Sequence, residues 1–413
     1  MKKNPVRAFS LAYMLGLAVL VFGAVTQPRL AEAQTVGGWR QEVAEKAQAA
    51  QEAGQAGNYS KAISLLKEAK AKAPLSAEEE QGVNELMIWA ASASRDYGLL
   101  ASTIEERLAT GRVRGAQLVS KLDTLAKTYY SQRNYPKAVD TLDKLAKARG
   151  SSNADDLIML GQSNYALKRY PDAARALEQA YTAAQKARKP VKVQVEILET
   201  LNNSYFKLGN KAKQTETLQK LMVVQPKVSH FEQLVVIAQQ DGADSVAMIN
   251  LFRLGDRKGV LAKEHYGKYA DAALDLSSPG EAVRAIEKGM AAGGIPKDDR
   301  NNRLLADSRT QVERLKAGIA QQEREAKAIA SGESDARLAL TFLTLGDKAK
   351  AVEAAQRALQ KGKVTRVDSL QFVLGVALYD QKKGADAKKA FDAAAAANPK
   401  VAGVARLWSQ VAG

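Results

Sequence analysis

The sequence predicts an all-α solenoid of stacked helix pairs, and three observations carry this prediction. Strong helix formers fill most of the chain, with only 10 Pro in 413 residues. Short turn motifs such as Gly-Asn and Arg-Asn-Tyr-Pro recur at intervals that fit helices of about 12 to 16 residues. A pattern of small and large apolar residues returns about every 36 residues. Because a chain of this length is too long for one compact core, a repeat array is favoured.

The first predicted element is a secretory signal peptide, residues 1–33. Positions 2, 3 and 7 are basic, residues 11–25 carry no charge, and residues 31–33 form a small-x-small cleavage motif. The apolar run of 15 residues is shorter than the about 20 that span a membrane, so cleavage is favoured over an uncleaved anchor. We therefore expect a periplasmic protein, whose net charge falls from +16 to +13 when residues 1–33 are removed.

Residues 34–400 form the predicted solenoid. The second helix of each unit carries a small or apolar residue, another four positions later, and a third three positions after that. Three longer gaps fit weaker copies near Ala101, Met248 and Ala317, which gives about ten units, weaker in residues 76–112, 228–256 and 297–330. Because no single pair can bury its apolar face alone, neighbouring pairs must stack. The series reads Ala62/Leu66/Ala69, Ala138/Leu142/Leu145, Ala173/Leu177/Ala180, Gln214/Leu218/Leu221, Ala282/Ile286/Gly289, Ala351/Ala355/Ala358 and Ala387/Phe391/Ala394.

The C-terminal unit shows what this pattern resembles. Leu374-Gly375 followed by Ala387, Phe391, Ala394 and Pro399 is similar to the signature of the tetratricopeptide repeat family. Residues 122–129 and 198–205 resemble the first-helix part of the same signature, and the resemblance extends over almost the whole chain after the signal peptide. It implies a right-handed superhelical solenoid whose first helices line a concave groove.

Residues 401–413 complete the array as a predicted capping helix. Repeat arrays need a terminal element with a polar outer face, and Trp408 offers the apolar contact that such a cap requires. The alternative for this segment is a partner-binding tail.

The sequence does not predict an enzyme, a cofactor or a metal site. There is no Cys, and no phosphate-binding loop, dinucleotide-binding turn, nucleophile elbow or zinc-protease motif occurs. The two His residues, His230 and His265, are interpreted as surface or packing residues. The acidic run 78–80 is interpreted as the first turn of a helix that begins after Ser76.

The resemblance to the family also implies a set of groove-facing residues. Tyr130, Tyr165, Phe206 and Tyr379 share one register, next to the polar residues Lys127, Gln162 and Asn203. Aromatic rings beside amides suit an extended peptide, which makes a protein or peptide the predicted partner. The alternative is that these aromatics fill the gaps between repeats. The family's clamp for a C-terminal carboxylate is not reproduced, because Asp123, Ile158 and Glu199 stand at the corresponding places.

The basic charge leads to a second hypothesis for the partner. Clusters at Lys186/Arg188/Lys189/Lys192 and Arg253/Arg257/Lys258 suggest an anionic polysaccharide or peptidoglycan as an alternative to a protein, whereas nucleic acid is not expected outside the cytoplasm. The alternative to polymer binding is that these cations have no partner and only keep the protein soluble. Turn motifs within residues 254–296 loosely resemble periplasmic repeat proteins found beside TonB systems, which implies an accessory role in outer-membrane uptake.

Overall fold

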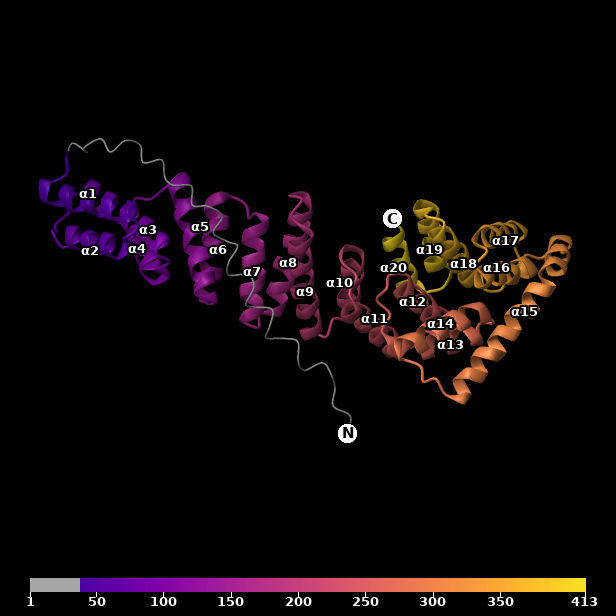
Figure 1. The fold of residues 1–413 in the computed structure, drawn as a ribbon. Coiled ribbons are helices and arrows are strands. Elements are labelled where there is room, and N and C mark those ends of the chain that lie inside the picture. The colour runs from indigo at the N-terminus through magenta and orange to yellow at the C-terminus, as the bar shows by residue number, and fades with distance from the viewer. Residues whose placement is uncertain (1–37) are drawn as a thin grey trace. The chain divides into compact units, whose positions relative to one another are not determined.

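The computed structural model describes residues 38–413, so the predicted signal peptide lies outside the described residues. Within this range there are twenty α-helices, one short 3-10 helix and no strand. Consecutive helices are joined by short turns and pack against each other in pairs (Figure 1). The predicted all-α repeat solenoid is therefore confirmed. The chain divides between residues 188 and 189 into two compact units, which are described separately.

Unit 1 contains four helix pairs. The small and apolar residues of the predicted series are buried between them, as Ala138 and Leu142 illustrate. The bounds are α1 (Gln41–Gln55), α2 (Tyr59–Lys70), α3 (Ala77–Ala93), α4 (Tyr97–Ala109), α5 (Gly115–Ser131), α6 (Tyr135–Arg149), α7 (Ala154–Ala166) and α8 (Tyr170–Lys186).

Every pair of unit 1 turns through the same corner. One residue adopts a left-handed conformation, the next precedes the second helix, and a Tyr begins that helix. In the third pair Arg133 has a φ of 58°, and the side chain of Asn134 accepts a hydrogen bond from the backbone N–H of Lys137. Asn and Asp are favoured at such N-cap positions because they satisfy a backbone donor that the helix leaves unpaired. The Arg-Asn-Tyr-Pro motif of the sequence is this corner.

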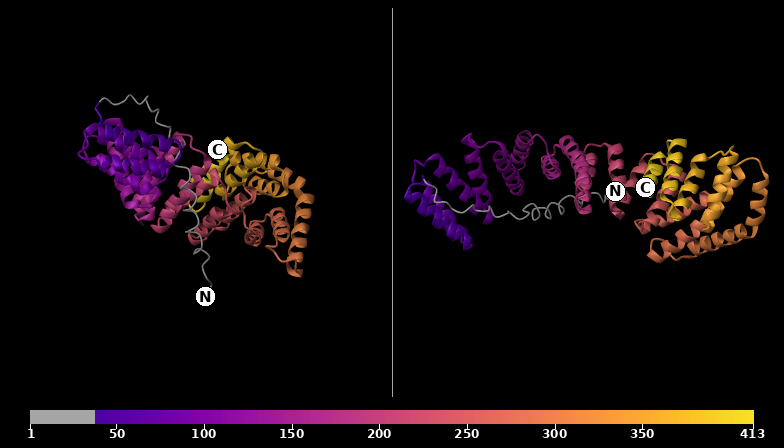
Figure 2. Two further views of the ribbon diagram at one scale, coloured as in Figure 1. Left: turned by 60° about the vertical axis from the view of Figure 1, so that its left-hand side comes forward. Right: turned by 90° about the horizontal axis from the view of Figure 1, so that it is seen from above.

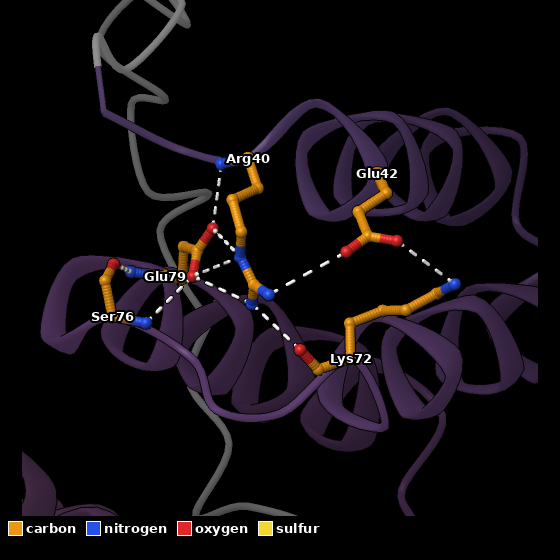
Figure 3. A network of polar contacts seen from close by, with 5 residues as sticks. All are labelled: Arg40, Glu42, Lys72, Ser76 and Glu79. Carbon is orange, nitrogen blue, oxygen red and sulfur yellow. Dashed lines mark hydrogen bonds and ion pairs between the residues drawn. The ribbon is translucent and has the colours of Figure 1, made fainter.

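An ion-pair network joins the starts of α1 and α3 (Figure 3). The backbone N–H of Arg40 donates to Oε1 of Glu79 at 2.8 Å, and its Nε donates to the same oxygen at 3.1 Å. A further guanidinium nitrogen donates to the carbonyl oxygen of Lys72 at 2.9 Å. The Glu79 carboxylate also accepts from the backbone N–H of Ser76 in a capping box, so α3 begins where the acidic run predicted. The hydrogen bonds from Arg40 lower the pKa of Glu79 to about 2.

This network predicts that unit 1 loses stability in acid. Because the pKa of Glu79 lies below its usual value of 4.5, its contribution to folding is present above about pH 4.5 and is lost as the pH falls towards 2. Glu79→Gln should lower the midpoint of urea unfolding at pH 7 and flatten its dependence on pH between 5 and 2. Tryptophan fluorescence measures this.

Glu78→Gln is the matched control, because Glu78 lies in the same helical turn but is exposed. It should leave the pH dependence of the wild type unchanged. A pH profile for Glu79→Gln that runs parallel to that of the wild type would contradict the assignment.

Unit 2 contains five helix pairs, one long single helix and a C-terminal helix. The bounds are α9 (Val191–Lys207), α10 (Lys211–Val224), α11 (Val228–Gln240), α12 (Ser245–Arg257), the 3-10 helix η3 (Lys263–His265), α13 (Tyr266–Asp275), α14 (Pro279–Ala292), α15 (Asp299–Ala328), α16 (Glu333–Leu345), α17 (Lys348–Lys361), α18 (Val367–Asp380), α19 (Gly384–Ala397) and α20 (Ala402–Ala412).

Unit 2 folds back on itself, so that α16, α18 and α20 lie against α10, α12 and α14 (Figures 1 and 2). The indole N–H of Trp408 on α20 donates to the carbonyl oxygen of Asn250 on α12 at 2.8 Å. The guanidinium of Arg257 binds both carboxylate oxygens of Asp380 on α18, each at 2.8 Å. At the other end, α14 contacts α16. The C-terminal helix α20 thus packs on α19, as a cap would, and also on α10 and α12 near the start of unit 2.

The repeat copy predicted near Ala317 is wrong, because α15 is one helix of 30 residues that joins the two halves of unit 2. Only Ser308 and Ala326 of α15 are buried, so most of the helix has no partner to bury against. Despite its length α15 is polar, and none of the described helices combines the length and apolarity needed to cross a bilayer.

The turn expected at Leu254-Gly255-Asp256 is also wrong, because these residues lie inside α12. A Cβ at Gly255 would overlap the ring of Phe231 on α11. The glycine is therefore required for close helix packing and not for a change in chain direction.

The fold-back of unit 2 predicts a large difference between two glycine substitutions. A Cβ at Gly280 on α14 would overlap the carbonyl oxygen of Thr344 on α16, whereas nothing lies within 4 Å of the same atom at Gly267 on α13. Gly280→Ala should therefore destabilise unit 2 by about 1–3 kcal/mol through overpacking. Gly267→Ala should stabilise it by about 0.5–1 kcal/mol, because Ala loses less backbone entropy in a helix. Urea unfolding followed by circular dichroism gives the free energy of unfolding of both variants. Equal changes in the two would argue against the contact between Gly280 and Thr344.

Candidate partner-binding surface

In unit 1 the predicted groove residues lie on the first helices α5 and α7. The hydroxyl of Tyr130 on α5 donates a hydrogen bond to Oε1 of Gln162 on α7 at 2.6 Å. Gln162 is 9% exposed and Tyr130 is half-buried. The structure therefore brings these two predicted residues together, as a bridge between neighbouring first helices.

The tyrosines of unit 1 pack on one another within each pair. The ring of Tyr165 meets that of Tyr170 edge to face with centroids 5.6 Å apart, and Tyr130 meets Tyr135 in the same way at 6.2 Å. Burial raises the pKa of Tyr165, although its side chain remains half-exposed. Each groove tyrosine thus fills a gap inside the array and still presents part of its ring to the surface.

The cation predicted for this surface, Lys127, is already neutralised. Its Nζ lies 2.7 Å from a carboxylate oxygen of Asp123, one turn earlier on α5. Asp123 is also 3.5 Å from the guanidinium of Arg149, which pairs in turn with the buried Asp156. A lysine held in this way is poorly placed to grip a free carboxylate, in agreement with the absence of the family's clamp.

In unit 2 the predicted residues Asn203 and Phe206 lie on the open side of α9. Phe206 is 51% exposed, and the ammonium of Lys207 lies 5.9 Å from its ring centroid. The amide of Asn202 donates to Oε1 of Gln233 at 3.0 Å, which ties α9 to the next first helix, α11. Asn203 and Phe206 are therefore more exposed than the corresponding residues on α5 and α7.

Val236 on α11 belongs to the same surface, and sequence reasoning missed it. It is 47% exposed and stands two residues after Leu234, as Asn203 stands two residues after Leu201. The position of Val236 relative to Leu234 could have identified it from the sequence. The alignment of this repeat with the others is not evident, however, because the repeat pattern is weak in residues 228–256.

Beside this surface a buried ion cluster holds α9 to α11. The carboxylate of Glu199 lies 2.8 Å from Nζ of Lys227 and 3.4 Å from Nε2 of His230, which is 4% exposed. Burial raises the pKa of Glu199, but the hydrogen bonds from His230 and Lys227 outweigh burial and leave it lowered. His265 makes the equivalent contact with Glu232 at 2.9 Å. Both His residues are thus packing residues, and no group of three or more metal-binding side chains occurs within residues 38–413.

Tyr379 is half-buried, as Tyr130 and Tyr165 are, but its neighbours come from other parts of unit 2. Its ring packs against Trp408 with centroids 5.3 Å apart, and the ammonium of Lys258 lies 5.8 Å from its centroid. Phe372, a second aromatic on α18, is fully buried within its own pair against Phe391 on α19. The fold-back of unit 2 brings Lys258, at the end of α12, to the ring of Tyr379.

One of the two predicted basic clusters is not a basic surface. Arg253 is buried and binds Glu281 through Nε at 2.9 Å, and Arg257 is paired with Asp380. These cations stabilise the interior of unit 2 and offer no charge to a polymer. At the other cluster Lys186 and Lys192, which belong to different units, are both exposed.

Comparison with known protein families finds a match to the tetratricopeptide repeat over residues 124–188 in unit 1 and 336–402 in unit 2. The chain contains tetratricopeptide repeats. The predicted family is thereby confirmed, and the two matches cover α5–α8 and the pairs α16–α19. Repeat arrays of this kind present extended surfaces to protein or peptide partners, which supports a protein-interaction scaffold.

Three solved structures illustrate what this tetratricopeptide repeat protein is similar to. A tetratricopeptide repeat protein from Parabacteroides merdae is 13% identical, with 82% of this chain and 100% of that chain covered and a TM-score of 0.33. The C-terminal part of a repeat-containing protein from Cytophaga hutchinsonii is 15% identical over 78% and 98% of the chains, with a TM-score of 0.30. The TPR2AB domain of yeast Sti1 in its pHSP90 complex is 15% identical over 72% and 100%, with a TM-score of 0.25. A comparison with curated proteins finds no match.

The exposure of Phe206 predicts that its side chain is nearly dispensable for folding. Phe206→Ala should change the free energy of unfolding by less than about 0.5 kcal/mol, as surface substitutions do. Phe391→Ala, the same change at a fully buried site, should cost about 3–5 kcal/mol. Urea unfolding measures both. A cost for Phe206→Ala close to that of Phe391→Ala would show that Phe206 is a packing residue.

Proposed function

We propose that this tetratricopeptide repeat protein is a non-enzymatic periplasmic scaffold that binds an extended protein or peptide segment along α9 and α11. The observation that carries the proposal is where large apolar side chains are exposed. Of the eight such residues in the described part of the chain, six fall between positions 191 and 236. Four of the six lie on α9 and α11, whereas Val223 lies on α10 and Leu208 follows α9. Apolar side chains that are exposed together mark an interaction surface, whereas single ones are ordinary. The six are Val191, Phe206, Leu208, Val223, Val228 and Val236.

The chemistry of this surface suits a peptide better than a charged polymer. Phe206 and Val236 offer apolar contact to side chains, and the exposed amide of Asn203 can both donate to and accept from a peptide backbone. The neighbouring charges are paired, as Glu199 is with Lys227. A partner would therefore be recognised mainly by apolar anchors and amide hydrogen bonds.

The periplasmic location rests on residues 1–33 and has its own test. Cell fractionation followed by mass spectrometry of the intact protein should find it outside the cytoplasm with Gln34 as its first residue. A protein that retains residue 1 in the cytoplasmic fraction would overturn this part of the proposal and leave the binding surface untouched.

An accessory role in TonB-type outer-membrane uptake is the narrowest form of the proposal. It is supported only by the resemblance of residues 254–296, and one of the motifs that carry it, residues 254–256, lies inside a helix. Identification of an uptake-system component as the partner would support this role, and any other partner would remove it.

Photocrosslinking in cells tests the binding surface directly. A photoreactive residue at Phe206 should give a discrete adduct that mass spectrometry can identify, and one at Tyr165 tests the corresponding surface of unit 1. Arg175 on α8 and Glu353 on α17, both exposed on second helices, serve as controls. Asn203→Ala should weaken the adduct at Phe206 without changing the unfolding midpoint. The same pattern of adducts from test and control positions would contradict the proposal.

A further inference from the structure

Unit 1 contains a second feature that could receive a ligand, a cleft of about 760 Å³ between α4, α5 and α6. Part of its lining is apolar, because α4, α5 and the turn between them contribute aliphatic side chains. Val113, Leu122 and Leu125 are buried, and Leu108 and Leu118 are partly exposed. These apolar side chains are Leu108, Val113, Leu118, Leu122 and Leu125.

The charged side chains of this cleft differ in how they are paired. Lys137 pairs with Glu105 at 2.9 Å, and the hydroxyl of Tyr129 donates to the same carboxylate. These hydrogen bonds lower the pKa of Glu105, so the carboxylate is ionised and forms a pair with Lys137 that is neutral overall.

The other cations of the lining form no ion pair within residues 38–413. Arg114, Lys144 and Lys147 line the cleft and are exposed, and no carboxylate among the described residues forms an ion pair with them. Asp140 is the only acidic residue of the lining besides Glu105. Four cations against two carboxylates leave the cleft with a positive potential above an apolar floor.

This cleft is separate from the groove residues described above. The α5 residues that line it, such as Leu118 and Leu122, form one stripe of the helix. Lys127 and Tyr130 belong to the adjacent stripe, which faces α7. A ligand in the cleft would therefore contact second helices, α4 and α6, which the groove residues do not use.

We infer that this cleft binds an acidic peptide segment of a partner protein, in which carboxylates flank an apolar side chain. The apolar floor provides burial for that side chain, and the guanidinium of Arg114 with the ammonium groups of Lys144 and Lys147 provides partners for the carboxylates. This ligand class follows from the combination, because a strongly charged polymer would gain nothing from the apolar floor.

Selection from a random 12-residue peptide library displayed on phage tests the inference with the full chain. The wild type should enrich peptides that combine Asp or Glu with an apolar residue. The double variant Lys144→Glu/Lys147→Glu should lose them, with Kd for a selected, fluorescein-labelled peptide raised more than tenfold. Lys61→Glu/Lys67→Glu on α2 is the matched control, since it makes the same charge change on another second helix and should bind as the wild type does.

A second variant separates the cleft from general electrostatics. Ala148→Trp fills the cleft mouth without changing charge, because Ala148 lines it and is exposed. It should also weaken the labelled peptide more than tenfold, while Phe206→Ala should not. Three outcomes would each overturn the inference. The two double variants lose peptide affinity equally, the selection enriches no peptides that are both acidic and apolar, or Ala148→Trp binds the peptide as the wild type does. Binding of anionic vesicles in place of peptides by the wild type would do the same. Because Phe206 lies outside the cleft, failure here leaves the proposed groove function intact.

Discussion

The close approach of two helices within each pair is the constraint on which the rest of this structure depends. In the pair α7–α8 a Cβ at Gly161 would overlap Leu177, and in α18–α19 a Cβ at Gly375 would overlap Phe391. Each large side chain therefore occupies the space that the missing Cβ leaves, and the two helices gain dispersion contacts that a wider spacing would forfeit. The stacking of one pair on the next follows from this, because a tightly closed pair presents a regular apolar side for its neighbour to cover.

In unit 2, helices also pack closely against helices that are not their neighbours in sequence. The long polar helix α15 reverses the direction of the array, so that α20, α18 and α16 meet α10, α12 and α14. Buried polar contacts fix the register of this meeting, since Arg257 binds Asp380 through two hydrogen bonds and Trp408 binds a backbone carbonyl. A repeat array that covers its own first helices gives up part of its binding surface for stability. Among the described residues, exposed large apolar side chains are most frequent on α9 and α11, as Phe206 and Val236 illustrate.

Features that depend on residues close in sequence could be predicted from the sequence, whereas contacts between distant helices could not. The small residues, the turn corners and the capping box are local, so their pattern predicted the pairs and their approximate limits. The position of Tyr379 in its helix was also read from local register, but its surroundings are not local. Lys258 and Trp408, which contact its ring, come from α12's C-terminus and from α20. The pair α11–α12 escaped the pattern for another reason. There the large residue, Phe231, stands on the first helix and Gly255 on the second, the reverse of α7–α8 and α18–α19.

This reversal also bears on why the surface near α9 and α11 is open. Where the large residue belongs to the second helix, the first helix can use its aromatics near the groove, and Tyr130 and Tyr165 pack there against Tyr135 and Tyr170. On α11 the phenylalanine points into the pair, and the exposed Gln239 stands in the register of those tyrosines. Val236, which is 47% exposed, stands in the register of Lys127 and Gln162. The ion cluster of Glu199 with Lys227 and His230 supplies the link between first helices that Tyr130 and Gln162 supply in unit 1. Ionic contacts thus join α9 to α11 without an aromatic bridge, so the exposed Val236 is not needed for that link.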